Sequence, residues 1–112
     1  MSYYKVEELK ETFSKSESKI YIQTKYGYYH SFKEAKKAFN GFKGKLKLSE
    51  KVIGLKIEER MNTKCSYEAT VRYNDNTDDV TVYSLKILNT IPKKIEQMEY
   101  GKIEEKHNSI EI

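Results

Sequence analysis

Residues 65–88 read CSYEATVRYNDNTDDVTVYSLKIL, and this stretch determines the fold class. In residues 65–73 apolar or aromatic side chains alternate with polar ones, which is the two-residue period of a half-buried β-strand. Residues 74–79 contain only Asn, Asp and Thr, a composition typical of a turn. β-Branched residues are frequent again in residues 80–88, so the stretch predicts a β-hairpin and hence an antiparallel sheet.

A second hairpin is predicted upstream, in residues 19–30. Residues 19–24 combine Ile, Tyr and Thr, which are strand-forming residues. Tyr26 and Gly27 mark a turn, and residues 28–30 form the returning strand.

A helix is predicted directly after this second hairpin. Ser31 is a favourable N-cap residue, and Glu34 follows it at the spacing of a capping box. Gly41 and Gly44 predict the end of the helix. The apolar side chains recur on one helical face, namely Phe32, Ala35, Ala38, Phe39 and Phe42.

Two further helices are predicted near the ends of the chain. Residues 3–15 carry apolar side chains at helical spacing, at Tyr3, Val6, Leu9 and Phe13. Pro92 suits the first turn of a last helix, which begins near Thr90 and ends at Gly101.

The remaining segments have weaker patterns. Residues 45–48 alternate strictly over only four positions, and residues 52–59 predict a strand. A helix that starts at Ser49 is the alternative for this region. Residues 102–112 are polar with scattered Ile, which predicts either an edge strand or a frayed tail.

The composition predicts one small domain. A chain of 112 residues, with ten Tyr and four Phe, can bury one core. We therefore expect residues 1–112 to form a single α+β domain, with an antiparallel sheet of two hairpins packed against two or three helices. Cys65 is the only cysteine, and no apolar run has the length of a signal peptide or membrane span. These features predict a cytoplasmic protein that does not bind membranes.

The positive charge is concentrated in one segment. Residues 19–56 contain ten Lys and two Glu, a net charge of +8, whereas residues 1–18 carry −1 and residues 57–112 carry −3. Nineteen of the twenty-one basic residues are Lys. Lys suits diffuse attraction to an anionic surface, while Arg is the better bidentate reader of bases. An AT-rich coding sequence is the alternative explanation for the lysine excess.

Within this segment lysines and aromatic residues are interleaved. Lysines neutralise phosphates, and aromatic rings stack on bases or sugars. The alternative is a solvated helix face beside ordinary core aromatics. The residues predicted to contact nucleic acid or another partner are Lys25, Tyr26, Tyr28, Tyr29, Lys33, Lys36, Lys37, Lys43, Lys45 and Lys47.

Residues 27–35, Gly-Tyr-Tyr-His-Ser-Phe-Lys-Glu-Ala, are followed by Gly-Phe-Lys-Gly at residues 41–44. Together they resemble the small hybrid-binding domain at the N-terminus of eukaryotic-type ribonucleases H. That family has a Ser/Thr-Trp-x-Glu-Cys helix start and a Gly-aromatic-x-Gly turn. Phe32 replaces its tryptophan and Ala35 its cysteine. Over residues 20–48 the resemblance implies binding of RNA–DNA hybrid or double-stranded RNA through backbone contacts.

Signals for catalysis and metal binding are weak. His30 and His107 are the only histidines, and neither forms a motif with Cys65. The segment that starts at Asn74 lacks the glycine and closing glutamate of a calcium loop, because Asp79 and Leu85 stand there. The sequence therefore predicts no enzyme, no catalytic residue, no metal and no cofactor.

Two classes of function follow from the sequence. The first is a non-enzymatic protein that contacts the phosphate backbone of nucleic acid. The second is a small phage or mobile-element protein that binds and inhibits a host or defence protein, such as a CRISPR effector, through an acidic surface of that protein.

Overall fold

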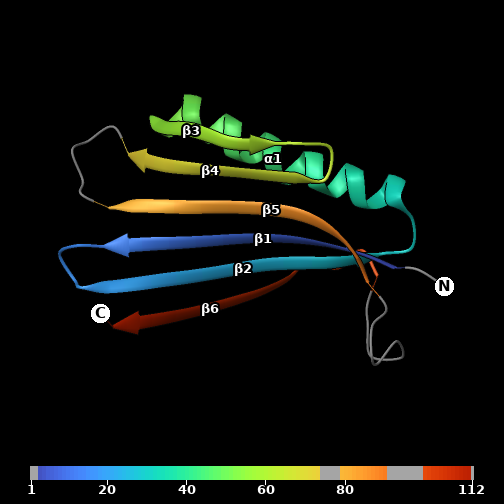
Figure 1. Cartoon of the computed structure of the whole chain (residues 1–112), viewed down its shortest axis with the longest axis horizontal. Coiled ribbons are helices and arrows are strands. Elements are labelled where there is room, and N and C mark those ends of the chain that lie inside the picture. The colour runs from blue at the N-terminus through green and yellow to red at the C-terminus, as the bar shows by residue number, and fades with distance from the viewer. Residues whose placement is uncertain (1–2, 74–78, 91–99, 112) are drawn as a thin grey trace.

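The computed structural model describes residues 3–73, 79–90 and 100–111 (Figure 1). A sheet and one helix form a small compact domain, which confirms the α+β class. The helix predicted over residues 3–15 is a strand. The described residues contain one helix instead of the two or three that were predicted. The elements in chain order are β1 (Tyr3–Ser14), β2 (Lys19–Tyr29), α1 (Phe32–Ile53), β3 (Leu55–Asn62), β4 (Ser66–Tyr73), β5 (Val80–Thr90) and β6 (Glu104–Glu111).

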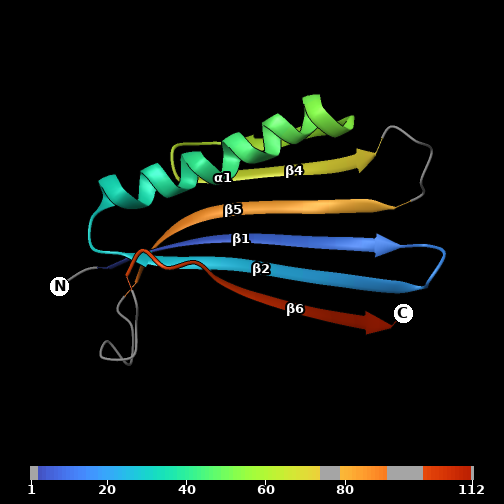
Figure 2. The same cartoon turned by 180° about the vertical axis from the view of Figure 1, so that it is seen from behind.

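The six strands form one antiparallel sheet in the order β3-β4-β5-β1-β2-β6. Helix α1 lies across one face, where it contacts β1, β2, β3 and β5. Figure 1 views the sheet from the opposite face, which no helix of the described chain covers, and Figure 2 views it from the helix side. We call the uncovered side the open face.

The core lies between α1 and the central strands. Three helix residues, Ala35, Phe39 and Leu46, pack against buried side chains of the sheet. The largest of these are Tyr67 on β4 and Tyr83 on β5, whose rings meet edge to face at 6.1 Å. The remaining buried members of the cluster are Val6, Leu55, Ala69, Val71 and Leu85. Tyrosine thus fills much of the core of a chain with modest aliphatic content.

The predicted start of α1 at Ser31 is confirmed, but the helix does not end at Gly41 and Gly44 as predicted. The Ser31 hydroxyl oxygen accepts a hydrogen bond from the Glu34 backbone N–H at 3.2 Å, as an N-cap does. The helix continues through Gly41 and Gly44 to Ile53, and Gly54 caps it in the left-handed conformation at φ 71°. Burial of Leu46 outweighs the small cost of glycine in a helix. Residues 45–48 are therefore helical, and residues 49–53 continue the same helix instead of starting a new one at Ser49. The strand predicted over residues 52–59 begins at Leu55.

The prediction of a helix over residues 3–15 is wrong, because β1 is the strand between β2 and β5. Val6 and Glu8 are buried on the helix side, and Leu9 and Phe13 lie on the open face. A strand that is flanked on both sides satisfies all its backbone groups in the ladder. That pairing outweighs the helical spacing of its apolar residues.

The predicted turn at Gly27 is also wrong, because β2 runs unbroken from Lys19 to Tyr29 and pairs with β1. Gly27 lies opposite Val6 and is buried. A Cβ atom there would lie 3.1 Å from Ile103 Cδ1 and 3.2 Å from the Lys102 carbonyl oxygen. Glycine is needed here for a close approach of the chain and not for a turn.

The later strands agree better with the sequence. β4 and β5 pair as predicted, and their connection at residues 74–78 lies outside the described residues. Strand β3 pairs with β4, and residues 104–111 form edge strand β6 beside β2. The predicted last helix falls mainly on residues 91–99, also outside the described residues, while Thr90 ends β5. Within the described chain, no helix has the length and apolarity to cross a membrane.

Candidate functional site

Six exposed or half-exposed lysines form a strip along one side of the helix, which we call the basic ridge. Five come from α1, where spacings of three and four residues bring side chains to neighbouring positions on the surface. The sixth comes from the turn between β3 and β4 and had no sequence signal, because that turn has no periodicity. The basic ridge consists of Lys33, Lys36, Lys37, Lys43, Lys47 and Lys64.

The inner flank of the ridge is tied to the β3–β4 hairpin. Lys36 Nζ donates to the Lys64 carbonyl oxygen, and Lys43 Nζ donates to Asn62 Oδ1. Lys47 Nζ lies 3.4 Å from Glu59 Oε1. These contacts fix the helix against the sheet edge and hold three ammonium groups in a row.

Aromatic rings lie beneath the same lysines. Lys36 Nζ is 4.4 Å from the centre of the Phe39 ring, and Lys43 Nζ is 5.0 Å from that of Tyr67. Lys64 Nζ lies 5.8 Å from the centre of the Phe32 ring. Cation–π attraction of this kind orients an ammonium group without neutralising it. These ring contacts therefore leave the positive charge of the three lysines in place.

The ridge lysines repel one another. Desolvation is the largest cause that lowers the pKa of Lys43; repulsion by Lys47 comes next and repulsion by Lys36 adds to it, while Glu59 opposes the shift. A hydrogen bond from Tyr67 is the main cause that lowers the pKa of Glu59, and Lys47 contributes. An anion placed on the ridge would relieve the repulsion between the ammonium groups.

The N-terminal end of the ridge borders an open depression of about 920 Å³. Three lysines and the Phe32 ring line it, together with the residues that begin the helix. The full lining is Ser31, Phe32, Lys33, Glu34, Lys36, Lys37 and Asn40. Lys33 and Lys37 are exposed there and form no hydrogen bond or ion pair with the part of the chain that the structure describes.

The other side of α1 faces β2 and β6 across a groove of about 480 Å³. Lys25, Tyr29 and Lys45 line this groove together with Phe42 and Glu105. Three of the residues predicted from the sequence therefore lie across the helix from the ridge.

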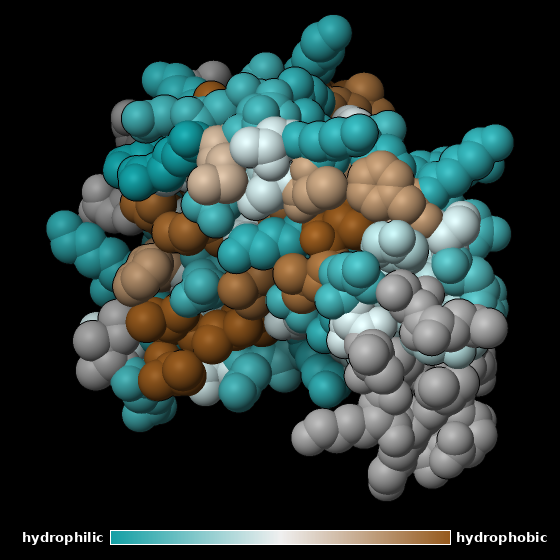
Figure 3. Space-filling model, turned by 45° about the vertical axis from the view of Figure 1, so that its right-hand side comes forward, coloured by the Kyte–Doolittle hydropathy of each residue, from teal (hydrophilic) through white to brown (hydrophobic). Residues whose placement is uncertain are grey.

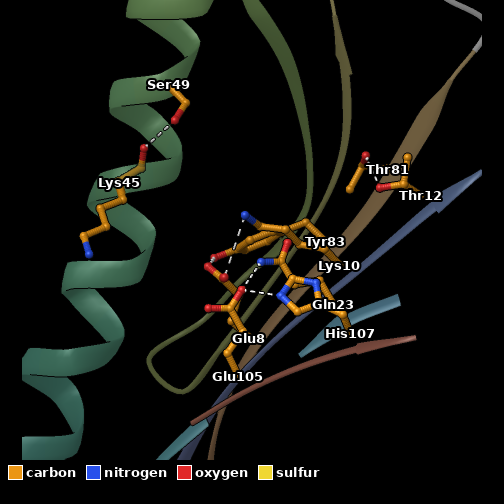
Figure 4. Close-up of polar contacts among 10 residues, drawn as sticks. All are labelled: Glu8, Lys10, Thr12, Gln23, Lys45, Ser49, Thr81, Tyr83, Glu105 and His107. Atoms are coloured by element: carbon orange, nitrogen blue, oxygen red, sulfur yellow. Dashed lines mark hydrogen bonds and ion pairs between the residues drawn. The ribbon is translucent and has the colours of Figure 1, made fainter. Parts of the chain in front are cut away.

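A smaller pocket of about 190 Å³ adjoins this groove, and Lys25 and Lys45 line both. The buried carboxylate of Glu8 lies in its wall. Figure 4 shows Glu8 with Tyr83 and Lys10 in this region, and Gln23, Glu105 and His107 nearby. No sequence pattern indicated a buried carboxylate here, since Glu8 stands in a run of charged residues.

Tyr26 and Tyr28 lie on the open face, away from every helix lysine. Their rings meet edge to face at 6.0 Å, and the nearest cations to Tyr26 are Lys5 at 4.8 Å and Lys106 at 5.6 Å. The ten predicted residues are thus divided among the ridge, the groove and the open face. The single surface of interleaved lysines and tyrosines expected from the sequence does not form.

Candidate catalytic groups are dispersed. The His30 ring stacks on Tyr100 at 3.6 Å, whereas His107 Nε2 lies 2.6 Å from Glu105 Oε1 on edge strand β6. In residues 3–73, 79–90 and 100–111, no three His, Cys, Asp or Glu side chains gather as a metal site.

Neither a protein-family model nor a curated protein nor a solved structure matches the chain.

Proposed function

We propose that the protein is a non-enzymatic binding protein that contacts the phosphate backbone of nucleic acid through the basic ridge. The observation that carries this proposal is the row of lysines along α1, with Lys64 added from the neighbouring turn. Two acidic residues, Glu34 and Glu50, are the only ones in the helix. The ridge is therefore the strongest concentration of positive charge in the described chain.

The spacing of the ridge suits a row of phosphates. A helix rises about 1.5 Å per residue, so Lys33 and Lys47 are separated by about 21 Å along the axis. Cations recur at about one per helical turn between them. Lysine attracts phosphate as a point charge and does not present the planar fork with which Arg reads guanine. The ridge therefore favours backbone contacts without base readout.

The ridge lysines of α1 are of two kinds. Lys36, Lys43 and Lys47 are held by the β3–β4 hairpin and keep the helix in place. Lys33 and Lys37 project from the exposed helix face beside them, and their donors are not used by the described chain. These two are the lysines that we expect to contact phosphates directly.

The position of the tyrosines favours a duplex over a single strand. Proteins that bind single strands stack bases on aromatic rings beside a positive groove. Tyr26 and Tyr28 lie on the open face, so they do not accompany the ridge lysines. The resemblance to the hybrid-binding domain adds RNA–DNA hybrid and double-stranded RNA to the proposed ligands. Its Gly41–Gly44 turn is helical here, so the proposed contacts rest on lysine side chains instead of that turn.

Fluorescence anisotropy tests this proposal directly. Labelled duplex DNA, RNA–DNA hybrid, double-stranded RNA and single strands of the same sequence are titrated with the protein at low salt. We expect the duplexes to bind at least as tightly as the single strands, and a second, unrelated sequence to bind equally well. If none of these nucleic acids binds at low salt, the proposal fails, and an acidic protein surface becomes the better ligand for the ridge.

A further inference from the structure

The open face carries a contiguous apolar area at the end of the sheet near the β1–β2 turn. Register places Ile110, Ile20, Phe13 and Val80 in one row across β6, β2, β1 and β5. Phe13 and Val82 are each 42% exposed, and Ile110 is 50% exposed. Figure 3 shows apolar side chains as a band across this side of the molecule. The whole area consists of Leu9, Phe13, Ile20, Ile22, Val80, Val82 and Ile110.

A single carboxylate stands inside this apolar area. Glu11 pairs with Ile22 on one side and Val82 on the other, and Leu9 and Phe13 are its neighbours along β1 on the same face. Glu11 is half-buried, and no hydrogen bond or ion pair joins it to any residue that the structure describes. Four apolar side chains therefore surround a carboxylate that has no polar partner in the described chain.

The Glu11 carboxylate restricts which kind of surface can bind to the open face. An apolar surface alone would strip water from Glu11 and leave a buried charge without a partner, which is strongly unfavourable. A surface that carries a cation at its centre would pair with the carboxylate while its apolar surround covers the four neighbouring side chains. Arg suits this role best, because its planar fork can bind both carboxylate oxygens.

The cations that a second copy presents on its open face are mostly held within that copy, Arg60 by Thr70 and Lys106 over the Tyr26 ring. On the open face Lys5 pairs with Glu7 at 2.9 Å, and Lys86 lies 3.9 Å from Glu68. Arg72 lies beside Val80, two strands away from Glu11. If two sheets stacked with aligned strands brought Arg72 of one copy to Glu11 of the other, Lys56, which pairs with Arg72, would lie over an apolar neighbour of Glu11, either Ile22 or Val82.

We propose that the open face centred on Glu11 is a docking surface for a different protein that presents an arginine or lysine within an apolar surround. This surface is separate from the basic ridge, which lies on the helix side of the sheet. The proposal therefore does not depend on nucleic-acid binding. Substitution of Glu11 should leave the affinity of the ridge for duplexes unchanged.

Amide chemical shifts test the surface with small probes. Hexylguanidinium supplies the cation on an apolar chain, while hexyl sulfate and hexanol are matched probes without it. We expect hexylguanidinium to shift the amides of residues 9–13, 20–22 and 80–82 and to bind about tenfold more tightly than the other two, as a charge-assisted hydrogen bond would require. Glu11→Gln, which keeps the shape of the side chain, should remove that preference.

Two results would overturn the proposal. The first is equal affinity for the three probes, or an unchanged preference for hexylguanidinium in Glu11→Gln. The second is a concentration-dependent dimer in sedimentation analysis that Phe13→Ser dissociates, because a second copy would then occupy the face. A monomer in sedimentation, together with the probe preference, supports a foreign partner. The amide spectrum also reports whether each variant remains folded.

Discussion

The Tyr83 hydroxyl donates a hydrogen bond of 2.5 Å to the Glu8 carboxylate, and both side chains are buried. Burial is the largest cause that raises the pKa of the Tyr83 phenol, and the charge of Glu8 raises it further. Lys10 Nζ is 3.8 Å from the other carboxylate oxygen. The pair joins β1 to β5 on the helix side, at the edge of the core. A charged residue in the middle of β1 is thus part of the structural framework.

Removal of that hydroxyl should destabilise the fold. Tyr83→Phe keeps the ring but leaves the buried Glu8 carboxylate without its donor, so we expect a loss of about 1–3 kcal/mol in the free energy of unfolding. Tyr73→Phe is the matched control, since Tyr73 is 48% exposed. Its effect should stay within about 0.5 kcal/mol. Urea unfolding measures both, and equal midpoints for the two variants would contradict the role of the Glu8–Tyr83 pair.

Alanine at two glycines should change stability in opposite directions. At Gly27 a new Cβ would meet Ile103 and the Lys102 carbonyl oxygen, so Gly27→Ala should cost about 1 kcal/mol. At Gly41 nothing lies within 4 Å of the position that a Cβ would take, and the residue is helical. Gly41→Ala should therefore stabilise the protein by about 0.5–1 kcal/mol. Thermal unfolding measures both shifts. A destabilising Gly41→Ala would contradict the continuous helix.

Acid should weaken the attachment of the helix to β3. The folded-state pKa of Glu59 lies below the ordinary value of 4.5, mainly because Tyr67 donates to its carboxylate and Lys47 lies nearby. The ionised Glu59 carboxylate thus stabilises the fold at pH values above its ordinary pKa. This stabilisation is lost as the pH falls through the lower folded-state pKa. Glu59→Gln should lower the melting temperature at neutral pH and flatten its fall on acidification.

The control for this experiment is Glu58→Gln on the same strand. Glu58 is exposed and makes no hydrogen bond or ion pair with the described residues. Its substitution should leave the pH profile of the melting temperature close to that of the wild type. Similar profiles for the two variants would show that Glu59 does not hold the helix to β3.

Local patterns predicted some elements because local chemistry determines them. Ser31 and Glu34 marked the start of α1, since a side-chain cap is a contact between near neighbours. The alternation in residues 65–73 predicted β4 because one face of that strand is buried. These segments needed no knowledge of distant parts of the chain.

Other elements depended on contacts that sequence spacing does not reveal. The helical spacing of residues 3–15 was misleading, because β1 is flanked on both sides and carries apolar side chains on both faces. Gly27 marked a close approach of Ile103, which is distant in sequence. Tyr26 and Tyr28 were separated from the lysines because strand alternation directs them to the face opposite α1. Lys64 joined the ridge only through the fold of the β3–β4 hairpin.

The salt dependence of duplex binding tests the account most directly. Two double variants that remove the same charge are compared. Lys33→Gln/Lys37→Gln removes it from the ridge, and Lys56→Gln/Lys86→Gln removes it from the open face. We predict that the ridge substitutions lower the affinity for duplexes and reduce the magnitude of the slope of log K against log salt by about 2, one per lost phosphate contact. The open-face substitutions should leave this slope unchanged. Equal effects of the two pairs, or a slope that neither pair changes, would contradict the ridge as the phosphate-binding surface.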